Sequence, residues 1–448
     1  MNEPRIRVEG IGPILQADIA LRPLTIFIGP NNVGKSYTSV VIHALKNALL
    51  DAVRTFRVQF FEKMKQEERE DAWPLSFERI MNKLEESLME NEQQQRLWSL
   101  CSQFLKTQME HNFSARINEL VNVDFDRLKL SIWNKRLEGY IELGRDETIE
   151  CGCKIRVTKR QKRVKLDYFL VEPTPSFLLP AARSGILQAH KTIAAVITSL
   201  SPLLPIRRIE IPRLSGVAAN FVSQLLTITE ARWFSIMDYI TWRSVVLRRR
   251  RLEKPLSRIL QFMEEELLKG RIVLKAPSKK LAPDIYYRSG DLLLPIHRAS
   301  SMVSELAPIY LYLKYILPVP SYLIIEEPES HLHPEAQRHM ARLLVRLVNA
   351  GVHVLVTTHS DYLLSQLNIH LLLSAKTREE VRKAGFDEDD RLEPDKIGVY
   401  LFKFSDGGSI AEELQVTEEG IPDYEFSKVA EAIHGIYTKL FYHRLFKK

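Results

Sequence analysis

The chain has 448 residues, enough for one large α/β core with an insertion or for two to three domains. Its net charge of +7 is mildly basic, which is compatible with a nucleic-acid partner but does not require one. No stretch approaches the roughly 18 uninterrupted apolar residues of a membrane span, and residues 1–5 contain no apolar signal region, so we expect a cytoplasmic protein. Its three cysteines form no zinc-ligand pattern and suit a reducing compartment: Cys101, Cys151 and Cys153.

The N-terminal part of the chain predicts strands, a glycine loop and a helix. Three strands are predicted first, at Arg5–Val8, Ile14–Ala20 and Leu24–Ile28. The third strand runs directly into eight residues with the pattern G-x-x-x-x-G-K-S: Gly29, Pro30, Asn31, Asn32, Val33, Gly34, Lys35 and Ser36. A helix is predicted to follow, from Tyr37 to Leu50.

Such a loop suits a phosphate group. Its glycines let successive backbone N–H groups converge on the β-phosphate, and the helix aims the positive end of its dipole at the same point. Lys35 would place its ammonium between the β- and γ-phosphates, and the Ser36 hydroxyl would ligate Mg²⁺. The whole stretch, together with Tyr37, is therefore the predicted binding site for ATP and Mg²⁺.

The middle of the chain predicts insertions into this core. Residues 51–120 are polar, contain few glycines or prolines and carry apolar residues at three- and four-residue spacing, which predicts a helical arm. Alternation within residues 123–171 predicts a β-hairpin or small sheet. A second helical block is predicted over about 186–269, and strands return at Arg271–Leu274 and Ile285–Arg288.

Two basic clusters, Lys159–Arg163 and Arg248–Arg251, lie within these insertions. Their charge could neutralise the phosphates of DNA or another nucleic acid, with an affinity that falls at high salt. A solvated helix face, or a site for an acidic partner protein, explains the same residues equally well.

Two further segments are candidates for contact with the nucleotide. A buried strand at Phe177–Leu179 leads into a loop with Arg183, which would stabilise phosphate charge or couple the site to the arm. A surface arginine after a strand is the alternative. Further on, Ser300 or Ser301 is predicted to cap a helix that has the acidic Glu305 in its first-turn region.

Two apolar runs near the end of the core each finish on polar residues. The run Ser321–Ile325 is followed by Glu326 and Glu327, and the run Val352–Val356 leads to His359. Both predict buried parallel strands whose C-terminal ends reach a ligand crevice, with one helix between them. Glu326 would hold Mg²⁺ through water, Glu327 would polarise the attacking water, and His359 would contact the γ-phosphate or that water. A solvated Glu-Glu pair at the start of a loop is the open alternative.

The motifs GPNNVGKS, LIIEEPESHLHPEAQ and VTTHS, in this order, resemble those of the ABC-type ATPases of the SMC/RecF group. Within that group the chain looks most like the ATPase half of the OLD (overcoming lysogenization defect) family and related stand-alone ATPases of bacterial defence systems. The resemblance covers residues 1–50 and about 175–370, and the C-terminal tail more weakly. It implies an α/β fold: an ABC-type P-loop ATPase core with a mixed/parallel sheet and an inserted helical arm.

The same resemblance implies several residue roles. Glu326 stands where the family has its metal-binding aspartate. The segment with Ser300 and Ser301 stands where a signature motif reaches across a dimer to the γ-phosphate, although both glycines of the usual LSGGQ sequence are absent. A PA-x-R-S-G stretch that lies near the nucleotide in OLD-like ATPases is matched here around Arg183.

The resemblance also bears on metal sites and on nuclease activity. Residues 329–334 stand at the D-loop, where His331 and His333 could form a metal pair but better suit a loop and helix start, with Pro334 near the first helical position. Full OLD proteins continue into a TOPRIM nuclease domain, which we do not expect in the tail of this chain. The D-x-D within Asp387–Asp390 follows no strand that ends in Glu, so a polar loop is predicted there.

We therefore expect five regions. They are a core lobe with the phosphate loop at 1–50, the arm and small β region at 51–175, a helical block with return strands at 176–295, the core with signature segment, acidic strand, D-loop and histidine loop at 296–370, and an α/β tail at 371–448. The tail is predicted to hold strands at Gly398–Phe404 and near Glu412–Val416 and a helix from Asp423 to Leu445.

Together these features predict an ATPase that forms dimers, or larger assemblies built from dimers, around ATP and Mg²⁺. Lys35, Glu327 and His359 are its predicted catalytic residues. It would act as the sensor or gate for DNA or for a separate effector, a nuclease or toxin, in anti-phage defence. A RecF-like DNA-repair ATPase and a slow ATP-dependent switch that cages a protein effector are the alternatives.

Overall fold

The computed structural model describes residues 5–47, 127–133, 137–144, 149–155, 174–189, 216–230, 253–275, 284–422 and 425–445. The predicted helical arm at 51–120 lies entirely outside these ranges, as do both basic clusters, Lys159–Arg163 and Arg248–Arg251. No helix in the described ranges has both the length and the apolar character needed to cross a bilayer.

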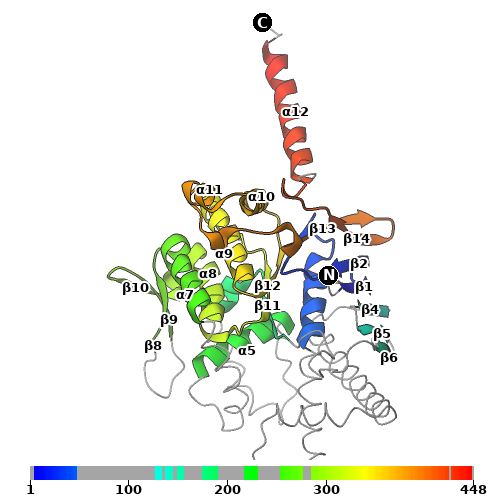
Figure 1. Cartoon of the computed structure of the whole chain (residues 1–448), viewed down its shortest axis with the longest axis horizontal. Helices are drawn as coiled ribbons and strands as arrows, with labels where there is room; N and C mark the ends of the chain where they lie inside the picture. Colours follow the sequence, from blue (N-terminus) through cyan, green and yellow to red (C-terminus); the bar gives the residue numbers. More distant parts are fainter. Residues whose placement is uncertain are drawn as a thin grey trace, which may run out of the picture.

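One 11-stranded mixed sheet organises the described chain, with helices packed against it (Figure 1). In spatial order its strands are β6 (Ile149–Ile155), β5 (Leu137–Gly144), β4 (Arg127–Trp133), β1 (Arg5–Ile11), β2 (Ile14–Ala20), β14 (Gly408–Leu414), β13 (Ile397–Ser405), β3 (Leu24–Ile28), β12 (Val352–Thr357), β11 (Ser321–Glu326) and β7 (Ser176–Leu179). The strands from β13 to β7 are parallel to one another, and those from β6 to β2 are antiparallel. The predicted α/β class with a mixed sheet is confirmed.

The parallel strands are apolar along their whole length because both faces of the sheet are covered. All five residues of β3 and all six of β11 are buried. Along β11, Tyr322 and Ile324 belong to one apolar core, while Leu323 and Ile325 belong to the other, on the opposite face. Burial of each aliphatic side chain of this kind contributes about 1.5–3 kcal/mol to the free energy of folding. The strand ends that form the site are therefore held by a well-packed core.

The two strands predicted in the C-terminal tail lie inside this sheet. β13 pairs in parallel with β3, the strand that precedes the glycine loop, and β14 pairs in parallel with β2. Aromatic packing helps to place β13, because the Phe27 ring lies 5.0 Å from that of Phe402 and 6.1 Å from that of Tyr400. The tail is therefore part of the sheet that carries the phosphate loop.

Helices cover the sheet and hold the candidate site residues. Residues 35–47 form the helix after the glycine loop. The other described helices are α5 (Gly216–Glu230), α7 (Glu253–Phe262), α8 (Ser301–Leu311), α9 (Pro334–Asn349), α10 (Asp361–Ser374), α11 (Arg378–Lys383) and α12 (Glu425–Leu445). The last turns after α7 and α8 widen into π-helices, Met263–Leu268 and Tyr312–Ile316. In Figure 1, α12 points away from the rest of the described chain.

A separate three-stranded antiparallel sheet contacts α8 and the π-helical turn after α7. It consists of β8 (Arg271–Lys275), β9 (Asp284–Ser289) and β10 (Leu292–Pro295). The first two strands match the predicted ones. The third was not predicted, since it has only four residues and ends on a proline.

Candidate nucleotide site

The ends of three parallel strands meet at one edge of the sheet. Glu326, the last residue of β11, pairs with Thr357 of β12, and Thr357 pairs with Phe27 of β3. Beyond this register the Glu327 N–H donates to Thr357 O at 2.9 Å, and the Thr358 N–H donates to Phe27 O at 3.0 Å. The glycine loop, the two acids and the histidine loop therefore leave the sheet side by side, where ligands bind in open α/β sheets.

The glycine loop has backbone geometry that only glycine accepts at two positions. Gly29 has a φ of +132°, and a Cβ there would lie 2.1 Å from Phe402 O. Gly34 has a φ of +93°, and a Cβ there would lie 2.5 Å from Ile14 Cγ1. Between them, Pro30, Asn31 and Asn32 are exposed. The loop thus packs closely on its own sheet while its tip stays open to solvent.

Lys35 is folded back into this loop. Its ammonium donates to Gly29 O at 2.8 Å and to Pro30 O at 2.5 Å, and the residue is 6% exposed. Burial lowers the pKa of Lys35 to about 8, opposed by the nearby carboxylates of Glu327 and Glu329. The cation is thus held in place by carbonyl oxygens that a phosphate can replace.

Glu326 lies within hydrogen-bonding reach of the start of the loop helix. The residue is 8% exposed, and its carboxylate accepts from the Ala181 N–H at 3.2 Å and from the Ser39 hydroxyl at 3.5 Å. Burial raises the pKa of Glu326, opposed by hydrogen bonds from Ala181 and from the Ser36 hydroxyl. A buried carboxylate next to a serine hydroxyl is the hard oxygen donor set that Mg²⁺ prefers, so these residues fit the ion.

Glu327 and His359 lie beside the lysine. Glu327 has a φ of +44°, uncommon for a side chain of this size, and its carboxylate accepts from the Ser330 hydroxyl at 3.0 Å. Burial lowers the pKa of His359, helped by the charge of Lys35 and opposed by Glu327. The lowered pKa favours the neutral imidazole, which can donate one hydrogen bond and accept another.

Arg183 lies behind the acids and is completely buried. Its guanidinium donates to Glu326 O at 2.7 Å and to Glu327 O at 3.1 Å, and it forms an ion pair with Glu305 at 3.1 Å. The alternative of a surface arginine is wrong, since the group is enclosed by protein, and the predicted contact of Arg183 with phosphate stays a prediction. Glu305 also differs from expectation, because it lies beyond the first turn of α8 and is buried, where it links α8 to the loop after β7.

The candidate signature segment begins α8 as predicted. Ser300 is the N-cap, and its hydroxyl accepts from the Val303 N–H at 3.3 Å. Both Ser300 and Ser301 are exposed. Neither serine is hydrogen-bonded to residues 29–37 in the described part of the chain.

The two histidines of the D-loop segment are not brought together as metal ligands. His333 is the N-cap of α9 and accepts from the Glu335 N–H, with Pro334 as first helical residue. His331 is exposed, with a φ of +59°. No cluster of three or more His, Cys, Asp or Glu side chains suited to a metal occurs within the described ranges.

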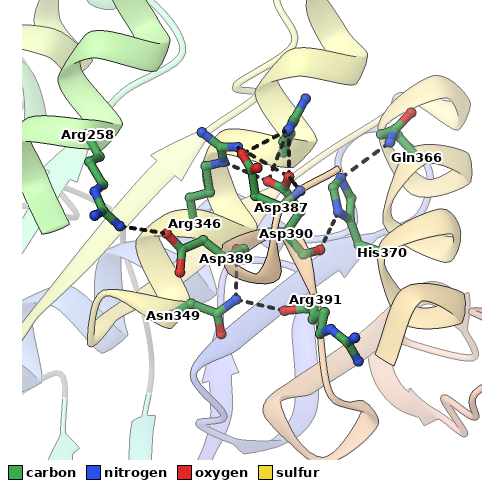
Figure 2. Close-up of polar contacts among 10 residues, drawn as sticks. Arg258, Arg346, Asn349, Gln366, His370, Asp387, Asp389, Asp390 and Arg391 are labelled. Carbon is green, nitrogen blue, oxygen red and sulfur yellow. Dashed lines mark hydrogen bonds and ion pairs between the residues drawn. The ribbon is translucent and has the colours of Figure 1, made fainter. Parts of the chain in front are cut away.

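The D-x-D segment anchors α9 and α10 through Asp390, so the prediction of a simple polar loop there is wrong. Its end forms a short 3₁₀ helix, and Asp390 is completely buried. Figure 2 shows the polar contacts of Asp390 and its neighbours. Arg342 and Arg346 of α9 both donate to its carboxylate, with contacts from 2.6 to 3.2 Å. Burial opposes ionisation, but the hydrogen bonds from Arg346 and Arg342 lower the pKa of Asp390 to about 2. Its backbone carbonyl also bonds to His370 of α10 at 2.6 Å.

Glu329 is a polar residue of the site that sequence reasoning missed. Its side chain is 9% exposed and bonds to the Thr358 hydroxyl and the His359 N–H. The available signal was a third acid two residues after Glu327 in a segment otherwise assigned to the D-loop.

Residues 201–365 match a family model described as "AAA domain, putative AbiEii toxin, Type IV TA system". No curated protein matches the sequence. Three solved SMC head structures are similar at low TM-scores. They are the head bound to the C-winged helix domain of ScpA (TM-score 0.42, 11% identity, 92% of this chain and 98% of that one), the head domain from Thermotoga maritima (0.38, 10%, 93% and 100%), and the head with an extended coiled coil bound to the C-terminal domain of ScpA, derived from Pyrococcus furiosus (0.40, 12%, 98% and 100%).

At these TM-scores and identities the fold assignment rests on the sheet topology and on the family match. The match covers the acidic strand β11 and the histidine loop. The glycine loop lies outside the matched residues but beside those strands in the sheet. The matched residues therefore include two of the three strand ends that meet at the candidate site.

Proposed function

We propose that this chain binds ATP with Mg²⁺ and hydrolyses it as an ABC-type ATPase. The observation that supports this most strongly is the register of β3, β11 and β12. It brings Lys35, the acids Glu326 and Glu327, and His359 to one edge of the sheet, although Lys35 precedes the other three by almost 300 residues in sequence.

Each residue has a role suited to its surroundings. The loop N–H groups and Lys35 hold the β- and γ-phosphates, with Lys35 exchanging the carbonyl oxygens of Gly29 and Pro30 for phosphate oxygens. Ser36 and Glu326 would hold Mg²⁺, which would neutralise phosphate charge. Glu327 accepts a proton from the attacking water, and the neutral His359 contacts that water or the γ-phosphate.

The exposed serines of α8 would complete the site of a second copy. Ser300 and Ser301 lie at a helix N-terminus, where free N–H groups favour an anion. Glu305 of the same helix pairs with Arg183, and Arg183 donates to the backbone of Glu326. Closure of a dimer around ATP, which brings α8 to the partner's nucleotide, would therefore also act on the acids of the helix's own nucleotide site.

We further propose that this closure gates a separate effector, a nuclease or toxin, in anti-phage defence. The resemblance to OLD-family ATPases and the toxin–antitoxin description of the matched family model support this role. The basic clusters outside the described residues would supply a contact with DNA whose strength falls with salt.

Steady-state ATP hydrolysis and nucleotide binding test the proposal. Lys35→Ala should abolish nucleotide binding. Glu327→Gln should bind ATP, lower the hydrolysis rate by about 10²–10⁴-fold and accumulate an ATP-dependent dimer in light scattering. Hydrolysis at the wild-type rate by Glu327→Gln would refute its role as the base.

A further inference from the structure

The turn after β11 carries a carboxylate that the proposed function does not use. Oε1 of Glu329 accepts two hydrogen bonds, from the Thr358 hydroxyl at 2.8 Å and from the His359 N–H at 2.7 Å. The Thr358 hydroxyl in turn accepts from the Ser360 N–H at 3.0 Å. One carboxylate oxygen thus connects to three consecutive residues that follow β12.

These bonds continue the contact between two strands after their ladder has ended. The last pairs between β11 and β12 are Glu326 with Thr357 and the Glu327 N–H with Thr357 O. On its other side the same loop is held by the Thr358 N–H bonded to Phe27 O at 3.0 Å. The backbone of His359 is therefore fixed from β11 by Glu329 and from the strand of the phosphate loop by Thr358.

We propose that Glu329 is a positioning residue, which holds the backbone of His359 so that the imidazole meets the γ-phosphate or the attacking water. This inference rests on the proposed ATPase function. The partly exposed His359 ring has no hydrogen bond of its own among the described residues, so its place depends on its backbone.

The two oxygens of Glu329 permit a clean separation of position from charge. Both donors bond to Oε1, and an amide oxygen accepts from them equally well. Oε2 is buried and has no hydrogen-bond donor in the described part of the chain. Glu329→Gln therefore keeps both hydrogen bonds that Oε1 accepts, whereas Glu329→Ala removes both of them.

Amide hydrogen exchange of the nucleotide-free protein tests directly whether Glu329 holds the backbone of His359. Exchange at the His359 N–H should be about tenfold or more faster in Glu329→Ala and within about twofold of wild type in Glu329→Gln. Glu379→Ala, which removes an exposed carboxylate of α11, should change nothing. Unchanged protection in Glu329→Ala would overturn the inference.

Kinetics test the consequence for catalysis. Glu329→Ala should lower kcat by about tenfold or more with little change in the KM for ATP, and Glu329→Gln should retain most of the wild-type kcat. In a His359→Ala background, Glu329→Ala should cause no further loss, because its effect passes through the histidine. A full further loss there, or a Gln variant as impaired as Ala, would contradict a positioning role.

The two proposals can fail separately. If the wild-type protein hydrolyses no ATP, the proposed function fails, while hydrogen exchange still decides whether Glu329 holds His359. If the wild type is active and Glu329→Ala is equally active, the positioning role alone is refuted.

Discussion

Removal of the Arg183 guanidinium should be among the most destabilising single changes in the described chain. The group is completely buried, pairs with Glu305 at 3.1 Å and donates to four carbonyl oxygens, among them Glu326 O and Glu327 O. Methionine would leave the Glu305 carboxylate buried without its cation. Breaking a buried pair from one side costs about 3–5 kcal/mol, so we expect Arg183→Met to lower the free energy of unfolding by that amount.

Urea denaturation followed by circular dichroism measures this loss. The double variant Arg183→Met/Glu305→Leu removes both charges and should recover about half of it, because no unpaired charge remains. Arg258→Met is the matched control, since Arg258 pairs with Asp389 at 3.9 Å with 78% of its side chain exposed, and such surface pairs contribute about 0–1 kcal/mol. A loss for Arg183→Met no greater than that of Arg258→Met would refute the reasoning that this pair joins α8 to the ends of β7 and β11.

Three further predictions concern the loop and the anchor of α9. Asp390 has a pKa of about 2 against an ordinary 3.8, so it contributes roughly 2.5 kcal/mol above about pH 4 that is lost as the pH falls through 2. Asp390→Asn should therefore unfold in less urea than wild type at pH 7, and the difference should shrink toward pH 2; a constant difference would contradict this. Because the pKa of Lys35 is about 8, affinity for a fluorescent ATP analogue should fall by up to about tenfold per pH unit above that value. An affinity that does not change with pH would contradict a contact between the Lys35 ammonium and the phosphates. Gly34→Ala should weaken the same binding about tenfold or more, since its Cβ would lie 2.5 Å from Ile14, whereas Gly185→Ala, with open space around it, should bind normally.

The parts of the site that could be predicted from sequence are those encoded locally. The glycine loop between a strand and a helix, and the polar ends of β11 and β12, follow from short-range periodicity and turn chemistry. The N-cap at Ser300 and Pro334 at the start of α9 were predictable for the same reason.

The parts that could not be predicted depend on contacts between distant residues. Arg183 and Glu305 are 122 residues apart, and nothing local to either one indicates that they meet in the interior. β13 was predicted as a strand, but its place beside β3 is set by non-local strand pairing and aromatic packing with Phe27. Asp390 lies in an acidic run typical of a solvated loop, and only its two arginines on α9 explain its burial.

The most direct test of the account is a structure of the Glu327→Gln protein with ATP and Mg²⁺. We expect one triphosphate at the edge formed by β3, β11 and β12. The Lys35 ammonium should have moved from Gly29 O and Pro30 O to phosphate oxygens, and Mg²⁺ should lie next to Glu326. A triphosphate bound elsewhere, with Lys35 still bonded to its own loop, would contradict it.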